Sequence, residues 1–276
     1  MSALSVDFAF KETYSIEDLL AIMRILRGEN GCPWDREQTH QSIRNNFIEE
    51  TYEAVEAIDN SDPVLLEEEL GDVLLQVVYH AEMEREAGRF SFEDVADGIC
   101  QKLIQRHPHI FGDVVAGTTD EVLDNWDEIK KKTKGQTTYT DTLKSVPKVF
   151  PSLMRAAKVQ KRAAKSGFAY PDGNWAMEAL SSEVEELREA LRQNDLSAAS
   201  EELGDLLLSA ANLSRYLDVD AEECLGTSCD KFISRFERLE ELAASRKVDM
   251  KKASPQEIIA LWEEAKRQHK SPNSSI

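Results

Sequence analysis

Residues 49–83 read EETYEAVEAIDNSDPVLLEEELGDVLLQVVYHAEM, and this stretch decides the fold class. Apolar residues recur at helical spacing on both sides of a central break. The break, residues 59–62, reads DNSD and consists of turn-forming residues. Pro63 directly after it suits the first position of a new helix. The stretch therefore predicts two helices joined by a tight turn.

The acidic part of this pattern occurs twice along the chain. Glu50-x-x-Glu53 is followed, after 15 residues, by Glu69-Leu70-Gly71-Asp72. Glu183-x-x-Glu186 is followed at the same spacing of 15 residues by Glu202-Leu203-Gly204-Asp205. One such motif arises easily by chance, but an ordered pair repeated at one spacing indicates an internal duplication.

Two basic pairs and two tryptophans recur downstream of the acids in the same order. They are Lys102 and Arg106 with Trp126 in the first copy, and Lys231 and Arg235 with Trp262 in the second. Each basic pair is four residues apart and shares one helix face, where Arg binds phosphate as a fork and Lys as a point charge. Each tryptophan can stack on a base. The alternatives are ordinary surface charge for the basic pairs and core packing for the tryptophans.

The rest of the chain also favours helices. Nearly every periodic segment has helical spacing, and no segment shows strand alternation or a hairpin turn. The sequence predicts an all-α fold made of tandem duplicated helical-bundle modules. We expect an N-terminal module over residues 1–135, a linker with two prolines over 136–151, a C-terminal module over 152–270, and a disordered tail over 271–276.

Four acids in each copy are expected to converge. Acids three residues apart share one helix face, with Cβ atoms about 5–6 Å apart. In an antiparallel hairpin, residues at equal distances from the turn centre face each other. Glu53 and Glu69 each lie eight residues from Ser61, and Glu50 and Asp72 each lie eleven residues from it. The second copy places its acids at the same distances from Asn194: Glu183, Glu186, Glu202 and Asp205.

This convergence is unfavourable without a cation. Two like charges about 4 Å apart repel by roughly 4 kcal/mol at an effective dielectric constant near 20. A divalent cation removes the repulsion, and all-oxygen ligands favour Mg²⁺, Mn²⁺ or Ca²⁺ over Zn²⁺. The alternative is that the acids form solvated helix faces. Gly71 and Gly204 further predict a close helix approach, because a glycine inside a helix costs about 0.5–1 kcal/mol.

Composition limits the possible partners. The chain has 276 residues, and its 33 Lys and Arg against 52 Asp and Glu give a net charge of −19. Such a charge disfavours general nucleic-acid binding and requires a cation wherever a nucleotide binds. The absence of an 18-residue apolar run predicts no membrane span. The start of the chain lacks the features of a secretory signal, and the four cysteines form no CxxC pair, so a cytoplasmic protein is expected.

These motifs resemble a known family. Glu49-Glu50-Thr51-Tyr52-Glu53 followed by Glu69-Leu70-Gly71-Asp72 is similar to the EExxE…ExxD signature of the MazG nucleotide pyrophosphohydrolases. Residues 31–35 (GCPWD), 106–109 (RHPH) and 167–168 (GF) also resemble stretches of two-domain MazG proteins. The resemblance implies the all-α pyrophosphatase fold, a homodimer and Mg²⁺-dependent hydrolysis, with Mn²⁺ as a possible substitute. The expected reaction converts nucleoside triphosphates to monophosphates and pyrophosphate, with broad base tolerance and a role in nucleotide-pool housecleaning.

The resemblance also assigns roles to residues. The metal ligands would be Glu50, Glu53, Glu69 and Asp72 in the first site, and Glu183, Glu186, Glu202 and Asp205 in the second. The nucleotide contacts would be Lys102, Arg106 and Trp126 in the first half, and Lys231, Arg235 and Trp262 in the second. Attack of water at the α-phosphate needs a group that orients or deprotonates the water, and Glu49 is our candidate. The alternative is that Glu49 is a solvated acid, or one that contacts a metal ligand rather than the metal.

The second copy departs from the family pattern. Ser182 stands where the leading Glu of EExxE is expected, and Ala179 stands where a Lys often occurs. Family members often catalyse in the C-terminal half, but these departures predict substantial activity in the N-terminal half of this chain.

Two other functions compete with this interpretation. A non-catalytic acidic helical interaction module would use the same acids as exposed surface. A di-iron carboxylate bundle needs two ExxH motifs, but only Glu37-x-x-His40 is present, outside the acid motifs.

Overall fold

The computed structural model describes residues 8–113, 118, 122, 126, 129 and 135–268. Within these residues the regular secondary structure is helical, with no strand, which confirms the all-α prediction. The chain divides into two compact units, Met1–Lys130 and Lys131–Ile276, and each is described by itself. The predicted disordered tail, residues 271–276, lies outside the described residues.

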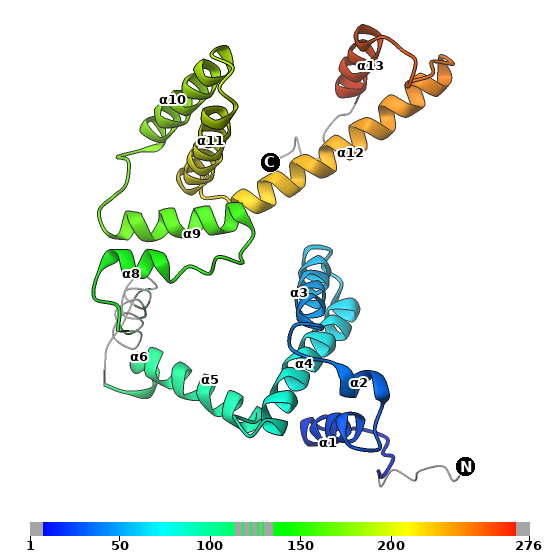
Figure 1. Cartoon of the computed structure of the whole chain (residues 1–276), viewed down its shortest axis with the longest axis vertical. Helices are drawn as coiled ribbons and strands as arrows, with labels where there is room; N and C mark the ends of the chain where they lie inside the picture. Colours follow the sequence, from blue (N-terminus) through cyan, green and yellow to red (C-terminus); the bar gives the residue numbers. More distant parts are fainter. Residues whose placement is uncertain are drawn as a thin grey trace. The chain divides into compact units, whose positions relative to one another are not determined.

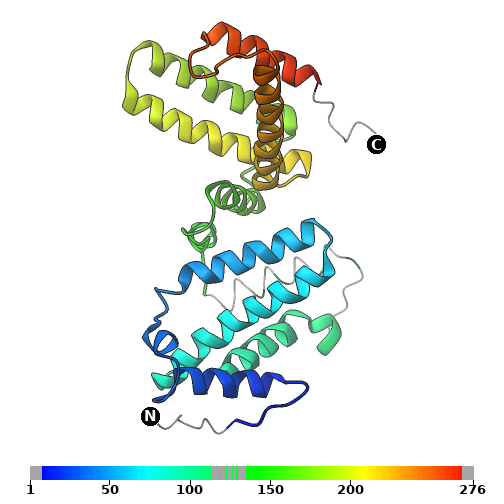
Figure 2. The same cartoon turned by 90° about the vertical axis from the view of Figure 1, so that its right-hand side faces the viewer.

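Unit one is built around a long helical hairpin. Its helices are α1 (Ile16–Arg27), α2 (Pro33–Glu37), α3 (Arg44–Asp59), α4 (Pro63–Glu86), α5 (Phe92–Arg106) and α6 (Pro108–Phe111). The helices α3 and α4 run side by side in opposite directions (Figure 2), while α1 and α5 each pack against α4. The hairpin thus brings the first set of acids onto two adjacent helices.

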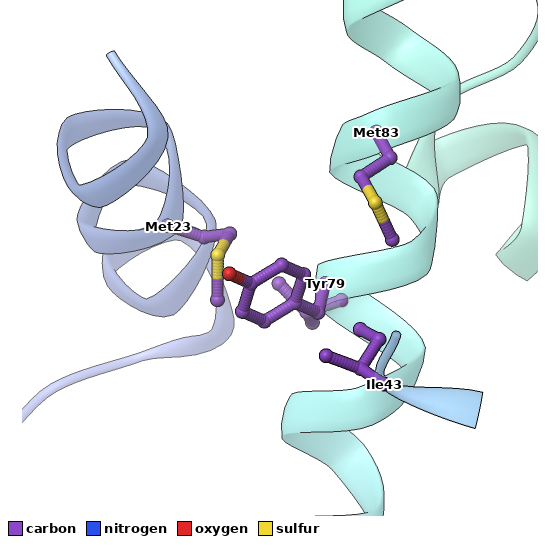
Figure 3. Packing of buried hydrophobic residues seen from close by; sticks show 5 residues of the cluster. Met23, Ile43, Tyr79 and Met83 are labelled. Carbon is purple, nitrogen blue, oxygen red and sulfur yellow. The ribbon is translucent and has the colours of Figure 1, made fainter. Parts of the chain in front are cut away.

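A small core holds α1 against α4. Met23, Ile43, Val78, Tyr79 and Met83 are all buried there (Figure 3). The Tyr79 hydroxyl donates to the carbonyl oxygen of Asp35 at 2.8 Å. Burial and the hydrogen bond with Asp35 raise the pKa of Tyr79 to about 12. This core therefore fixes both α4 and the α2 segment that leads into α3.

Unit two repeats the hairpin and extends it. Its helices are α8 (Tyr139–Lys144), α9 (Ser152–Lys165), α10 (Gly173–Arg192), α11 (Leu196–Leu217), α12 (Ala221–Ser245) and α13 (Pro255–Gln268). The helices α10 and α11 form the antiparallel hairpin, and α9 packs on α11. The long helix α12 starts beside α9 and α11, and α13 folds back onto its far end (Figure 1), where Leu239, Leu242 and Leu261 are buried.

The turns of both hairpins have the predicted chemistry. Asp62 accepts hydrogen bonds from the first backbone N–H groups of α4, and Pro63 is the first residue of that helix. Asp195 caps α11 in the same way. Ser61 and Asn194, at the predicted turn centres, both have left-handed backbone conformations, with φ of 53° and 55°. The turn positions read from the sequence are therefore confirmed.

The segment predicted as a linker, residues 136–151, contains the helix α8. Thr138 caps this helix with a reciprocal hydrogen-bond pair to Asp141. The guanidinium of Arg162 on α9 donates to the carbonyl oxygen of Thr142 and to Ser145 Oγ, so α8 is held on α9. Part of the predicted linker is thus an ordered element of unit two, because local capping and the hydrogen bonds of the half-buried Arg162 outweigh its polar composition.

The predicted close helix approach at Gly71 and Gly204 is wrong within each unit. A Cβ atom added at either residue would meet nothing within 4 Å. Both glycines lie on exposed faces of α4 and α11 rather than on the faces that meet α3 and α10. Gly204 instead lines a cavity of about 580 Å³, together with Leu153 and Ala156 of α9.

Candidate active site

The α3–α4 hairpin brings three acids of unit one together. Glu50 on α3 and Glu69 and Asp72 on α4 each present a carboxylate oxygen, and these oxygens lie within 4.8 Å of one another. None of the three is fully exposed. Glu53, one turn along α3, is close enough to influence the pKa values of Glu50 and Glu69. The hairpin register read from the sequence is what produces this cluster.

Burial and, after it, charge repulsion raise the pKa values of two acids in the cluster. Burial, followed by the negative charges of Asp72, Glu53 and Glu69, raises the pKa of the Glu50 carboxyl above its ordinary value. Burial, followed by Glu53 and Asp72, raises the pKa of Glu69. The protein itself supplies no compensating positive charge among the causes of either shift, so ionisation of the cluster is unfavourable without a bound cation.

Unit two assembles a similar but not identical cluster. Carboxylate oxygens of Glu183, Glu186 and Glu202 lie within 4.8 Å of one another. Burial, then the charges of Glu186, Asp205 and Glu183, raises the pKa of Glu202. Asp205 is exposed and is not one of the three clustered acids, so the ligand geometry of the two units differs at this position.

The residue that precedes the first clustered acid also differs between the units. Glu49 is exposed on α3 and forms no hydrogen bond or ion pair with the described residues. Ser182 occupies the matching position, and its hydroxyl donates to Glu186 Oε1 at 2.8 Å. Sequence analysis identified this exchange but missed the hydrogen bond, which engages one of the clustered acids of unit two.

The donor atoms of both clusters fit a hard divalent cation. Carboxylate oxygens are the ligands that Mg²⁺, Mn²⁺ and Ca²⁺ prefer, and no His or Cys belongs to either cluster among the described residues. His40, from the ExxH motif, instead contacts Glu84, with Nε2 and Oε1 2.6 Å apart, and stacks on His80. The structure therefore offers no support for a di-iron site.

The basic pairs do not meet the acid clusters within their own units. No hydrogen bond or ion pair joins Lys102 or Arg106 to the acids of unit one, or Lys231 or Arg235 to those of unit two, among the described residues. The Nε atom of Arg235 is buried without a hydrogen-bond partner.

Each tryptophan packs against an aromatic ring that sequence analysis did not link to it. The ring of Trp126 meets His107 edge-on, with centroids 4.9 Å apart, and Trp126 Nε1 is buried without a partner. The ring of Trp262 lies 5.1 Å from that of Phe232. Both partners stand next to the basic pairs in sequence, which is the signal that could have revealed these contacts.

Comparison with known proteins places these features in a family. A family model described as the MazG nucleotide pyrophosphohydrolase domain matches residues 38–111 and again residues 174–239. The chain belongs to the MazG family. It is a nucleotide pyrophosphohydrolase, a hydrolase that acts on phosphoanhydride bonds, and the double match confirms the tandem arrangement.

Several full-length relatives are similar to this MazG chain. The "Nucleoside triphosphate pyrophosphohydrolase/pyrophosphatase MazG" of Thermotoga maritima is 40% identical over 250 residues, covering 91% of this chain and 95% of that protein. The "Nucleoside triphosphate pyrophosphohydrolase" of Escherichia coli K12 is 41% identical over 256 residues, covering 92% and 97%. The "Uncharacterized protein YabN" of Bacillus subtilis is 44% identical over 250 residues, which is 89% of this chain and 50% of that protein.

The MazG matches cover the acid clusters and both basic pairs but neither Trp126 nor Trp262.

None of the helices that the structure describes combines the length and the apolar character of a bilayer-spanning segment.

The metal-free MazG protein is expected to become more stable when Glu50 is replaced by Gln. Because the folded-state pKa of Glu50 lies above its unfolded value, stability falls as pH rises from about 4.3 through the folded pKa. Above that pH range the Glu50 carboxylate is ionised, and its burial beside other acids lowers the stability of the folded chain. Glu50→Gln removes this charge and its unfavourable contribution to stability. In EDTA near pH 7.5, the thermal midpoint of the variant should exceed that of wild type by a few degrees.

Two controls accompany this measurement. The difference should shrink as pH falls and wild-type Glu50 becomes protonated, and Glu56→Gln, an exposed acid on the same helix, should have no comparable effect. A Glu50→Gln variant less stable than wild type in EDTA at neutral pH would show that the cluster is not under charge repulsion.

Proposed function

We propose that this MazG enzyme hydrolyses nucleoside triphosphates to monophosphates and pyrophosphate in a Mg²⁺-dependent reaction. The observation that carries the proposal is the duplicated cluster of carboxylates within 4.8 Å of one another. The names of the Thermotoga and Escherichia coli relatives assign them action on nucleoside triphosphates. An anionic substrate approaching a chain of net charge −19 requires such cation sites.

Each cluster would hold Mg²⁺ through the acids named above, with Mn²⁺ as a substitute. When bound, the ion supplies neutralising charge to phosphate oxygens and orientation to a water molecule. The Glu49 carboxylate accepts a proton from the attacking water molecule while the oxygen of that water forms a bond to the α-phosphorus. The bond from the α-phosphorus to the bridging oxygen breaks, and pyrophosphate leaves with both electrons of that bond.

The remaining proposed residues bind the nucleotide rather than react with it. Lys102 and Arg106, and in the other half Lys231 and Arg235, hold the oxygens of the leaving pyrophosphate. Trp126 and Trp262 present aromatic faces to the base. Stacking does not read base edges, which supports a broad base tolerance and a role in housecleaning of the cytoplasmic nucleotide pool.

We also propose that the working form is a homodimer. Large apolar residues are exposed on the hairpins and the following helices, among them Leu70 at 55% and Leu203 at 48%. They lie beside Gly71 and Gly204, where an added Cβ atom would meet nothing within 4 Å. A second copy covering these faces would bury the apolar surface and could bring a basic pair to an acid cluster.

Light scattering at micromolar concentration is expected to give about twice the 31.2 kDa chain mass. Leu70→Lys with Leu74→Lys should shift the species toward the monomer, because two charges would be buried in the interface. A wild-type mass of 31.2 kDa under these conditions contradicts the dimer proposal.

A panel of triphosphates tests the proposed reaction. Each nucleotide is incubated with Mg²⁺ and the full-length chain, and pyrophosphate and phosphate are quantified separately. We expect monophosphate and pyrophosphate in equal amounts from all common bases. Release of inorganic phosphate with a diphosphate product would contradict the proposed bond cleavage, and binding without turnover would revive the non-catalytic interaction module.

A further inference from the structure

A cavity of about 430 Å³ lies between α9 and the end of α11, apart from both acid clusters. Lys158 and Lys161 from α9 and Arg215 from α11 line it, together with Asp218 and Asp220 from the segment before α12. Its volume falls within the range of small-molecule sites. None of the proposed metal ligands or nucleotide-binding residues lines this cavity, so it needs a separate explanation.

The internal duplication shows that this charge is specific to unit two. Arg215 follows Asp205 by ten residues, just as Glu82 follows Asp72 in unit one. There the buried Glu82 accepts from Arg85 at 2.6 Å and lies 3.8 Å from Arg24 on α1. The position that carries an ion-paired carboxylate in unit one, Glu82, therefore carries a cation in unit two, Arg215.

The cations of the cavity form no ion pairs, although two acids line the same cavity. This holds for Lys158, Lys161 and Arg215 within the part of the chain that the structure describes. The helix that supplies the lysines, α9, has the sequence SLMRAAKVQKRAAK, with five cations and no acid. In a chain of net charge −19 this is an unusual local excess of positive charge.

Arg215 is held in place with donor capacity to spare. Its NH2 group donates to the Tyr216 hydroxyl at 2.8 Å, and its guanidinium carbon lies 4.7 Å from the centre of that ring. Tyr216 is anchored in turn, because its hydroxyl donates to the Tyr170 carbonyl at 2.9 Å. The Nη1 atom of Arg215 forms no hydrogen bond with the described residues and is the donor that remains for a ligand, whereas Nε is buried without a partner.

The acids that line the cavity restrict which anion fits. The Asp220 carboxylate already accepts hydrogen bonds from Glu222 N and Glu223 N at the start of α12. Asp218 has no hydrogen-bond or ion-pair partner among the described residues, so it presents a free acceptor to the cavity. A fully ionised anion would be repelled there, whereas an anion that retains a proton can donate it to Asp218.

We propose that this cavity binds a phosphate-bearing anion, whose ionised oxygens accept from Lys161 and Arg215 while its protonated oxygen donates to Asp218. Phosphate and its monoesters are partly protonated near neutral pH, with a second pKa near 6 for the monoesters. Sulfate has the same shape and no such proton. The site therefore binds phosphate in preference to sulfate, and it does so without a metal ion.

Calorimetric titration of the full-length chain with inorganic phosphate, in EDTA at low ionic strength near neutral pH, tests this proposal. We expect saturable binding, with sulfate at least about tenfold weaker. Lys161→Gln should weaken phosphate binding about tenfold or more, as expected for one charge-assisted hydrogen bond. Arg155→Gln removes an exposed cation of the same helix that does not line the cavity, and it should leave the affinity unchanged.

Asp218→Asn tests the role of the acid. Because this variant removes the carboxylate that repels an unprotonated anion, its affinity for sulfate should approach its affinity for phosphate. No saturable binding up to about 10 mM phosphate would overturn the proposal. Equal losses in Lys161→Gln and Arg155→Gln would overturn it too, since they would indicate general attraction to α9. Equal affinity of the wild type for the two anions would refute the role of Asp218. None of these results depends on hydrolytic activity.

Discussion

Glu50→Gln is expected to reduce pyrophosphate release at least about 100-fold, whereas Glu183→Gln should leave a substantial part of the activity. The two residues match in position, and each belongs to the three clustered acids of its unit. The difference follows from their neighbours, because Glu49 is free beside the first cluster while Ser182 is hydrogen-bonded to Glu186. A water molecule in unit two therefore lacks the carboxylate that would take its proton.

Both variants should be compared at saturating Mg²⁺ and triphosphate, with circular dichroism to show that helicity is unchanged. Glu56→Gln provides a control, since this exposed acid shares α3 with Glu50 and lies outside the cluster. If Glu183→Gln alone abolishes release and Glu50→Gln stays near wild type, the C-terminal half is the catalyst. That result would mean that Glu49 is dispensable and that the metal alone positions the water.

Glu50→Gln separates function from stability. The same substitution is expected to stabilise the metal-free chain, because it removes a carboxylate whose pKa is raised by burial and by its acidic neighbours. A residue kept for structure would lose stability and activity together. Opposite changes in the two quantities are typical of a site whose charge repulsion is retained for ligand binding.

The sequence was sufficient to place the hairpins and most of their acids. Turn residues such as Asp62 and Asp195 fix where each helix starts, and equal spacing from the turn then fixes which acids face each other. Spacing along a helix does not determine the side-chain rotamers, which decide which carboxylate oxygens meet. Glu53 and Asp205 were expected among the clustered acids, but both lie exposed beside them.

Contacts between distant segments could not be predicted in the same way. Gly71 and Gly204 suggested a close helix approach, but each faces open space within its unit. The cationic cavity depends on α9 meeting the end of α11, which lies about 50 residues further along the chain. In the sequence these residues are indistinguishable from ordinary surface charge. Only the packing of α9 on α11 places Lys161 and Arg215 in the lining of one cavity.

Comparing the two units shows how duplicated modules diverge. Glu49 corresponds to Ser182, and Glu82 corresponds to Arg215, while the hairpin that presents the acids is retained. The first exchange changes the group beside the clustered acids, and the second reverses the charge where two helices meet. Each unit thus keeps the same scaffold but offers a different chemistry next to it.

Removal and return of the metal tests the central claim most directly. The full-length chain is stripped with EDTA, transferred to metal-free buffer, and assayed for pyrophosphate release from ATP before and after addition of Mg²⁺. Because the clustered carboxylates repel both one another and the triphosphate, the stripped enzyme should be inactive. Mg²⁺ or Mn²⁺ should restore activity, and Zn²⁺ should do so poorly. Undiminished pyrophosphate release from thoroughly stripped protein would contradict the assignment of the acid clusters as catalytic metal sites.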